Sequence, residues 1–329
     1  MKKGITSIKV DATNPARVYL AADEGVYFSE SGGESWKELN QGLITEDVKS
    51  LAIATNGKVY GGTKGYGIYT LEPGRKSWQG PFAVTNFGVH WHVWDRPLYL
   101  YNALLISPTN PETMYLGSFP SGFYKSTDGG RTWHETNIKF TNDGAFYLTF
   151  HPDNEEIIYA GTYNGVSKSE DAGRSWRKID QGMPPEQWVF SIVINPDNPD
   201  IIYSASKNGQ NKGKDARDFY GMVMKSIDGG ESWFEIMNGL DKNEEFYQLV
   251  IYPDNHNILF LSSWGRVYFT DNGGESWQPI NDGLDVPPGV VNNVANNLDI
   301  DAEGRYLYLG TGGRGVYRVD LRQLNLEKN

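Results

Sequence analysis

One short motif recurs along this chain and constrains its fold more than any other feature. It is eight residues long, begins with Ser, ends with Trp, and has Asp at its third and Gly at its fifth position. Ser31 and Asn272 replace the Asp in two near copies, the second of which begins with Thr270 in place of Ser. Pro73 replaces the Asp in a worn copy that keeps the length and the Trp. Three full copies, two near copies and the worn copy occupy residues 126–133, 169–176, 226–233, 29–36, 270–277 and 71–78. A turn sequence repeated this often indicates one structural unit used many times.

The spacing of the motifs identifies that unit. The Trp residues that end the copies lie mostly about 43 residues apart, which is the length of a propeller blade of four short strands. An apolar inner strand, a turn and two further strands precede each motif, and an outer strand follows it. A seventh segment, residues 298–320, lacks the motif and has only nine residues after it. We therefore expect a seven-bladed β-propeller in a single domain over residues 1–329, whose last blade has three strands or a short fourth.

The composition agrees with an all-β fold. The chain has 38 Gly, 16 Pro, 10 Trp, 20 Tyr and 14 Phe, a balance that favours short strands and tight turns over long helices. Each blade is expected to be a four-stranded antiparallel sheet with the motif as the turn before its outer strand. The inner strands are expected at residues 5–10, 49–54, 102–107, 147–151, 190–195, 247–252 and 297–301.

The pattern Ser-x-Asp-x-Gly-x-x-Trp resembles the Asp-box, or BNR, repeat of sialidase-like β-propellers. The resemblance covers nearly the whole chain. Propellers of this kind include sialidases, xyloglucanase-type glycoside hydrolases, sortilin-type receptors and the photosystem II assembly factor. They share a fold and no single activity, so the resemblance implies the fold more than the function. The Arg-Ile-Pro signature that a sialidase would carry is absent from this sequence.

The repeated aspartates Asp128, Asp171 and Asp228 are expected to be structural rather than catalytic. At this spacing the Ser and Asp side chains can accept hydrogen bonds from backbone N–H groups of the turn, and the Trp can pack into the seam between sheets. The symmetry of a propeller also spreads the copies around one rim, too far apart to act together.

The net charge of the chain and its first residues limit which partners it is expected to bind and where in the cell it is expected to be. The net charge is −11, which disfavours binding to nucleic acid or an anionic membrane. The sequence has no Cys and therefore no disulfide or thiolate site. Residues 1–10 lack the apolar run of a secretory signal, and no window is apolar enough for a membrane span. The chain as written is expected to be cytoplasmic, and a mature secreted form stays open.

The first of two long intervals between motifs contains a stretch rich in histidine and tryptophan. The excess lies in residues 80–101, where His90 and His92 alternate with Trp91 and Val93. In an extended segment this alternation places both imidazoles on one face. Imidazole is a general acid or base near neutral pH, and tryptophan offers a flat surface for a sugar ring. We expect the insertion to border one end of the channel; the alternative is a lid whose histidines only form hydrogen bonds.

The His-x-His sequence is also half of a metal site. A third ligand would have to be a carboxylate such as Asp95 or Asp143, because the remaining histidines lie in turns at the opposite end or after a motif Trp. The ligand set is incomplete, so we expect no metal and no cofactor.

The second long interval contains a polar, basic insertion at residues 207–221. It is expected between the second and third strands of the fifth blade, either as a solvated excursion or as a positively charged lid. Lys64, Arg266 and Arg314 fall in the equivalent loops of other blades. Cations that converge on one site favour an anionic ligand such as a uronate.

These insertions and the loops at the same end of the ring define the candidate site. The expected catalytic residues are His90, His92, Tyr147 and Tyr247. The expected substrate-binding residues offer aromatic faces, a carboxylate or cations, and they are Trp91, Trp94, Asp95, Arg96, Tyr101, Trp188, Trp264, Arg266 and Arg314. Aromatic faces beside charged groups are typical of carbohydrate sites.

The fold resemblance and these candidate residues are compatible with two functions from different classes. The first is a carbohydrate-active enzyme that cleaves a glycosidic bond of an oligo- or polysaccharide, including an acidic one, at the channel mouth. It would be a glycoside hydrolase with paired carboxylates or a polysaccharide lyase with His and Tyr. The second is a non-catalytic propeller that docks a protein partner. The histidine and tryptophan stretch favours the enzyme, with a carbohydrate as its ligand.

Overall fold

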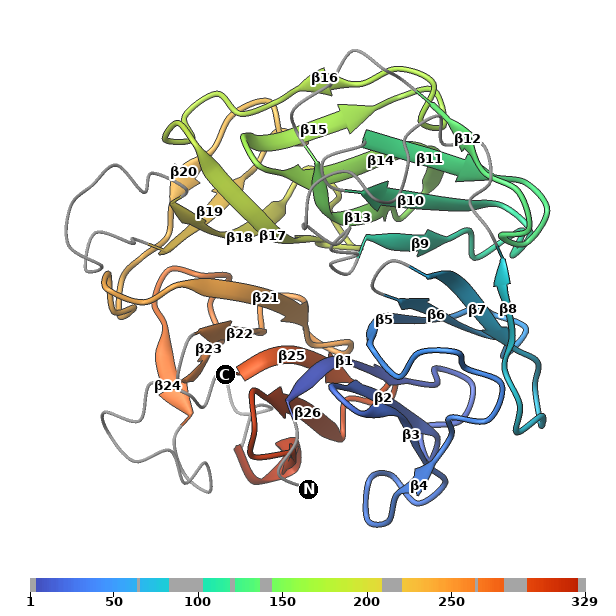
Figure 1. The fold of residues 1–329 in the computed structure, drawn as a ribbon. Helices are drawn as coiled ribbons and strands as arrows, with labels where there is room; N and C mark the ends of the chain where they lie inside the picture. The colour runs from blue at the N-terminus through green and yellow to red at the C-terminus, as the bar shows by residue number, and fades with distance from the viewer. Residues whose placement is uncertain are drawn as a thin grey trace, which may run out of the picture.

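Seven antiparallel sheets surround a central axis in the computed structural model of the chain (Figure 1). The structure describes residues 4–63, 66–82, 103–118, 122–136, 144–208, 221–263, 266–280 and 295–324. Within these ranges six sheets have four strands, and the sheet closest to the C-terminus in sequence has three. The predicted seven-bladed propeller is confirmed, and its last blade has three strands in the described residues, which is one of the two forms expected for it.

Each blade pairs its strands in chain order. The first four blades are blade 1 with β1 (Ile5–Val10), β2 (Val18–Ala22), β3 (Gly25–Ser29) and β4 (Lys37–Glu38), blade 2 with β5 (Val48–Ile53), β6 (Val59–Thr63), β7 (Gly67–Leu71) and β8 (Gln79–Phe82), blade 3 with β9 (Leu104–Ile106), β10 (Met114–Ser118), β11 (Gly122–Ser126) and β12 (His134–Glu135), and blade 4 with β13 (Ala145–His151), β14 (Asn154–Thr162), β15 (Gly165–Ser169) and β16 (Arg177–Lys178).

The remaining blades follow the same plan. They are blade 5 with β17 (Gln187–Ile194), β18 (Ile202–Asn208), β19 (Gly221–Ser226) and β20 (Phe234–Glu235), blade 6 with β21 (Phe246–Ile251), β22 (Leu259–Ser263), β23 (Val267–Thr270) and β24 (Gln278–Ile280), and blade 7 with β25 (Ala295–Ile300), β26 (Tyr306–Thr311) and β27 (Val316–Asp320). A short 3-10 helix, η1 (Leu321–Leu324), follows blade 7.

The inner strands β5, β13, β17, β21 and β25 begin one to three residues before their predicted starts. The pairing register of these strands and of β1 shifts near the first residue, which marks a β-bulge. A bulge inserts one extra residue and breaks the alternation of side chains. Because alternation is the pattern that predicts a strand, the sequence places these starts too late.

The two ends of the ring are built from different kinds of segment. Inner strands begin at one end, which we call the channel mouth, beside the connection between the second and third strands, as the pairs Ile5 with Ala22 and Ala22 with Gly25 show. We call the opposite end, where the motif turns lie, the turn end. There, Gly129 N donates to the Glu112 carbonyl at 2.9 Å, which joins the motif turn to the turn between the first two strands of its blade.

The motif turns are held by their own Ser and Asp side chains, as predicted. Ser126 Oγ accepts from Gly130 N at 2.9 Å and donates to Asp128 Oδ1 at 2.8 Å, and Asp128 Oδ1 accepts from Thr132 N at 2.8 Å. Burial acts to raise the pKa of Asp128, but the hydrogen bonds from Thr132 and Ser126 prevail and lower it to about 2. Asp171 and Asp228 make the equivalent backbone bonds. These aspartates anchor turns.

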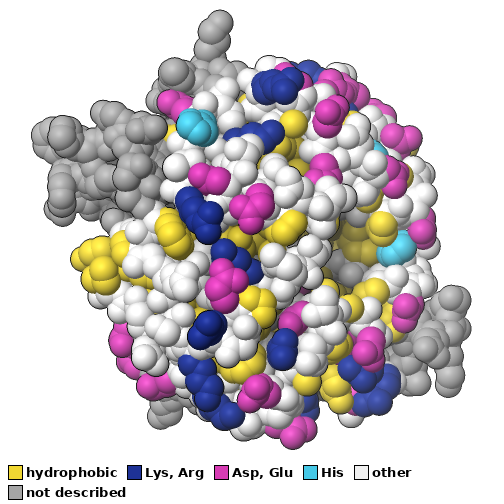
Figure 2. Space-filling model, turned by 90° about the vertical axis from the view of Figure 1, so that its right-hand side faces the viewer, with side chains coloured by type: hydrophobic (Ala, Val, Ile, Leu, Met, Phe, Trp, Pro, Cys, Tyr) yellow, Lys and Arg dark blue, Asp and Glu magenta, His cyan; other side chains and the backbone are white. Residues whose placement is uncertain are grey.

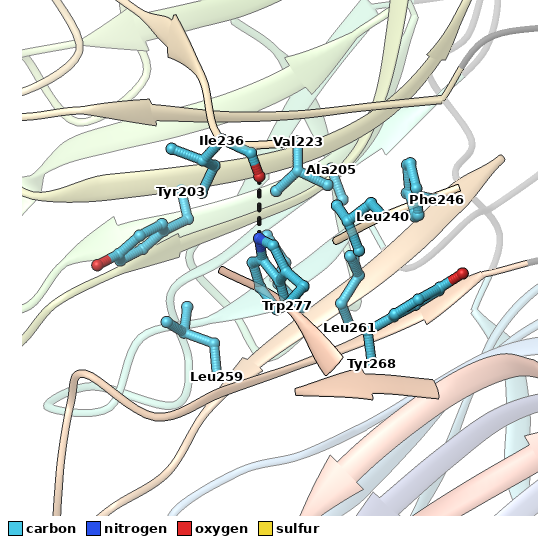
Figure 3. Packing of buried hydrophobic residues seen from close by; sticks show 11 residues of the cluster. Tyr203, Ala205, Val223, Ile236, Leu240, Phe246, Leu259, Leu261, Tyr268 and Trp277 are labelled. Carbon is cyan, nitrogen blue, oxygen red and sulfur yellow. Dashed lines mark hydrogen bonds between the residues drawn. The ribbon is translucent and has the colours of Figure 1, made fainter. Parts of the chain in front are cut away.

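The motif Trp fills the seam between neighbouring blades. Trp277 of blade 6 is 3% exposed and packs with Tyr203 and Val223 of blade 5 and with Leu261 of its own blade (Figure 3). Its Nε1 donates to the carbonyl of Ile236, just after β20, at 2.9 Å. The indole therefore ties blade 6 to blade 5 both by packing and by a buried hydrogen bond.

Hydrogen bonds between blade 7 and blade 1 close the ring. On the inner strands, Asp299 Oδ2 accepts from Val10 N at 2.8 Å. At the turn end, the Tyr308 hydroxyl and the Arg318 guanidinium both donate to the carbonyl of Gly32, at 3.1 and 2.6 Å. These bonds join strands from opposite ends of the chain.

Charges of both signs are interspersed on the side of the ring that lies to the right in Figure 1, with Lys and Arg beside Asp and Glu (Figure 2). No helix in the described part of the chain combines the length and the apolar character needed to cross a membrane.

Candidate functional site

Five aromatic side chains from three neighbouring blades form a continuous row at the channel mouth. Phe146 and Tyr163 come from blade 4, Trp188 and Phe190 from blade 5, and Tyr247 from blade 6. Successive ring centres lie 4.5 Å (Trp188 to Tyr163), 4.6 Å (Tyr163 to Phe146), 4.9 Å (Phe146 to Phe190) and 5.6 Å (Phe190 to Tyr247) apart. Phe146 is buried and the other four are partly exposed. We call these five residues the aromatic row.

The β-bulges of the inner strands supply three members of the row. The pairing register shifts across Phe146 in β13, Phe190 in β17 and Tyr247 in β21, so each is the extra residue of its bulge. A bulge bends the strand and re-aims the side chain. The same shift falls on Thr6 in β1 and Lys49 in β5. One arc of the mouth is therefore aromatic, and blades 1 and 2 carry polar residues at the equivalent position.

A charged pair lies against the aromatic row. Lys207 Nζ, on β18, is 5.0 Å from the centre of the Trp188 ring and 5.7 Å from that of Phe190, and it lies 3.6 Å from Glu245 Oε1. Tyr247 donates a hydrogen bond to the other oxygen of Glu245. Burial, with this bond to the carboxylate, raises the pKa of Tyr247 far above its ordinary value. The phenol therefore stays protonated near neutral pH and acts as a donor.

A second polar cluster begins one residue before Glu245. Glu244 lies 3.3 Å from the Arg266 guanidinium and accepts a hydrogen bond from the Tyr268 hydroxyl at 3.2 Å. Arg266 also donates to the Tyr268 hydroxyl at 3.3 Å and lies 3.8 Å from Asp241. Two carboxylates thus balance the charge of Arg266.

Tyr147 follows Phe146 on β13, one residue further from the mouth. Burial raises its pKa to about 12, and the nearby Asp299 adds to this while a hydrogen bond with Ser191 opposes it. Burial also raises the pKa of Asp299, against the effects of Lys9 and of the hydrogen bond from Val10 N. Because Tyr147 and Asp299 come from blades 4 and 7, this electrostatic contact acts across the channel.

The structure places some of the predicted site residues and leaves others outside its described ranges. Trp188 and Tyr247 lie in the aromatic row, and Tyr147 lies next to it on the same strand as Phe146. Arg266 belongs to the neighbouring cluster. Arg314 lies between β26 and β27 of blade 7, away from blades 4 to 6, where its backbone N donates to Thr311 Oγ1 at 3.0 Å. The predicted residues outside the described ranges are His90, Trp91, His92, Trp94, Asp95, Arg96, Tyr101 and Trp264.

The expected site residues omit three members of the row, Phe146, Tyr163 and Phe190, and sequence reasoning also missed the position of Lys207. Lys207 was expected at the start of the basic insertion, and it instead lies on β18 with its charge over the row; most of the insertion, residues 209–220, lies outside the described ranges. The available signal was an aromatic residue just before the regular alternation of β13, β17 and β21 begins. No group of three or more His, Asp or Glu in the described part of the chain is placed to bind a metal ion.

Comparisons with known proteins agree with this fold. The family model of sortilin (neurotensin receptor 3) matches residues 82–220. A xyloglucanase from a Paenibacillus species is 27% identical over 191 residues, which cover 52% of this chain and 18% of that protein. The chain therefore spans only a small part of this relative.

Two solved structures show the same fold at different lengths. The GH74 enzyme of Niastella koreensis matches with a TM-score of 0.75 and 20% identity, over 97% of this chain and 52% of that one. YCF48 from Cyanidioschyzon merolae matches with a TM-score of 0.64 and 13% identity, over 96% of this chain and 95% of that one. The resemblance to xyloglucanase-type and sortilin-type propellers that the sequence predicted is confirmed.

Proposed function

We propose that this protein is a carbohydrate-active enzyme that binds an oligosaccharide along the aromatic row and cleaves a glycosidic bond there. The observation that carries the proposal is the row itself, with partly exposed rings from three blades and a charged pair beside them. Sugar rings stack their C–H faces on such rings while polar groups fix their hydroxyls. The similarity to a xyloglucanase supports the same ligand class.

The charges near the row favour a neutral sugar over a uronate. The acidic ligand was expected from converging cations, but Lys207 is paired with Glu245 and Arg266 with Glu244. A carboxylated sugar would have to displace these partners and would meet Glu245, which is itself 9% exposed. A neutral hydroxyl can accept from Lys207 and donate to Glu245 without leaving either charge unpaired.

Glu245 is the carboxylate that we assign to the reaction. Lys207 and Tyr247 hold it against the row. An ionised carboxylate in that position can stabilise the positive charge that develops at the anomeric carbon during cleavage. The role that the sequence assigned to Tyr247 becomes that of a protonated donor to Glu245, and His90 and His92 stay candidates for the general acid.

Titration calorimetry with neutral xyloglucan oligosaccharides and with acidic oligogalacturonides tests the proposal, together with an assay for new reducing ends. We expect the neutral ligands to bind and Trp188→Ala to weaken binding by about tenfold or more, as loss of a central aromatic contact does. Phe234→Ala is the matched control, because Phe234 is an exposed aromatic of the same blade that lies outside the row. Unchanged binding by the Trp188 variant would refute the assignment of the row.

A second function, docking of a protein partner, is favoured by one observation. Ile44 and Tyr66 are 70% and 55% exposed, and both lie in connections on the mouth side, Ile44 between β4 and β5 and Tyr66 between β6 and β7. Large apolar side chains exposed on the same end of a protein are the kind of group that a protein partner covers. A chain that binds neither the neutral nor the acidic oligosaccharides would favour this function over the enzyme.

A further inference from the structure

A cavity of about 250 Å³ opens at the mouth end of blade 5, apart from the aromatic row. Its apolar walls are Pro184, Met222 and Met237, and its polar lining includes Gln187, Glu235 and Lys242. Gln187 is the first residue of β17 and precedes Trp188. Because neighbouring residues of a strand point to opposite faces, Gln187 and Trp188 point to opposite faces of this blade, and Trp188 is not part of the cavity lining.

Gln187 is the most buried polar side chain among the described lining residues, and one of its two amide atoms has no hydrogen-bond partner among the described residues. Gln187 is 1% exposed, and its Oε1 accepts from Ser206 Oγ at 2.9 Å. Its Nε2 has no hydrogen-bond partner within the described residues. A buried N–H group without an acceptor is unfavourable, and native proteins pair nearly all of them. The cavity therefore lacks an acceptor that a ligand could supply.

The rest of the lining narrows the chemistry of that ligand. Met222 and Met237 offer polarizable, apolar contacts, and the Met237 sulfur is held in place by a hydrogen bond from Val223 N at 3.2 Å. Among the described lining residues, Glu235 and Lys242 carry the only charges, which are of opposite sign and exposed. A carbonyl oxygen satisfies Gln187 without bringing a donor of its own, and a methyl group suits the thioethers. An acetyl group carries both on one carbon atom.

We propose that this cavity binds the acetyl group of an acetylated sugar. Its carbonyl oxygen accepts from Gln187 Nε2, and its methyl group packs between Met222 and Met237. The volume leaves room for the sugar ring that carries the group. This inference rests on the proposed carbohydrate function and extends it, because it makes acetylation a feature that the protein recognises.

Methyl NMR of protein labelled at the methionine methyl groups tests the proposal. The probe is N-acetylglucosamine, and glucose, which lacks the acetamido group, is its control. We expect N-acetylglucosamine to shift the Met222 and Met237 signals in a saturable way and glucose to leave them in place. Equal shifts with both sugars, or none with either, would overturn the proposal.

Three variants check where the sugar binds. Gln187→Met keeps the volume and removes the donor, and it leaves Ser206 with a second acceptor, the Met222 carbonyl at 3.2 Å; we expect the affinity to fall about tenfold. Met222→Trp fills the cavity with Gln187 intact and should abolish binding. Met183→Leu, which alters a methionine outside the lining, should bind as the wild type does. Wild-type affinity in both cavity variants would exclude this site.

A fourth variant separates this inference from the proposed function. Trp188→Ala should lose oligosaccharide affinity and keep the methionine shifts caused by N-acetylglucosamine. Those shifts in a protein that binds no oligosaccharide would refute the proposed function and leave the acetyl site standing. The reverse result, oligosaccharide binding without the shifts, would refute the acetyl site alone.

Discussion

The turn end and the channel mouth of this propeller are made from the same strands and differ in how closely the blades repeat. At the turn end, Asp128, Asp171 and Asp228 each accept a backbone bond four residues ahead, at 2.8 or 2.9 Å. At the mouth, one equivalent bulge position holds Thr6 in blade 1 and Phe190 in blade 5. Residues that repeat from blade to blade have a structural role. A position that is geometrically equivalent but holds different residues in different blades can be used to bind a ligand.

Two tryptophans at opposite ends sharpen this comparison and give the largest expected effect. Trp277→Ala should destabilise the protein by about 3–5 kcal/mol, because it empties the seam between blades 5 and 6 and removes the donor to the Ile236 carbonyl. Trp188→Ala should cost less than about 1 kcal/mol, because that ring is partly exposed. Denaturant unfolding of both variants measures the difference. Equal losses of stability in the two variants would mean that Trp188 contributes as much to the fold as Trp277 does.

The sequence predicted the turn end well because its geometry is local. A Ser and an Asp two residues apart form hydrogen bonds within the turn that they occupy, so the motif alone is enough to predict these bonds. The aromatic row has no such local code. Phe146, Phe190 and Tyr247 meet only after three strands assemble, and each lies in a bulge that breaks the pattern used to find strands.

The charged residues at the mouth show the same limit of prediction from sequence. Lys207 and Glu245 are 38 positions apart in the sequence and become an ion pair only through the packing of blade 5 on blade 6. Sequence reasoning counted Arg266 as a cation open to an acidic ligand, whereas the fold supplies it with Glu244 and Asp241. Net charge and loop position therefore predict where charges gather and not which of them remain available.

The pH dependence of a motif aspartate gives an intermediate effect. The folded pKa of Asp128 is about 2, below its ordinary value of 3.8. A lowered carboxyl pKa stabilises the fold above the ordinary value, and this stabilisation is lost as the pH falls towards 2. Solvent screens this partly exposed side chain, so Asp128→Ala should cost only about 1 kcal/mol at neutral pH. Unfolding followed from pH 6 to pH 2 should show the gap between wild type and variant closing below about pH 4; a constant gap would contradict the role of the charge.

The smallest expected effect tests the backbone of the motif turn. The fourth residue of each motif adopts left-handed φ, 67° at Gly129 and 57° at Ala172. A residue with a Cβ is strained there by about 1 kcal/mol, whereas glycine is not. Ala172→Gly should therefore stabilise the protein by about 0.5 kcal/mol, because the relief of strain exceeds the added flexibility of the unfolded chain. Gly129→Ala is the reciprocal change and should destabilise it by about 1 kcal/mol, since its new Cβ would also lie 3.0 Å from the Glu112 carboxylate. Thermal unfolding of both variants should give shifts of opposite sign, and shifts of the same sign would show that the two turns are not equivalent.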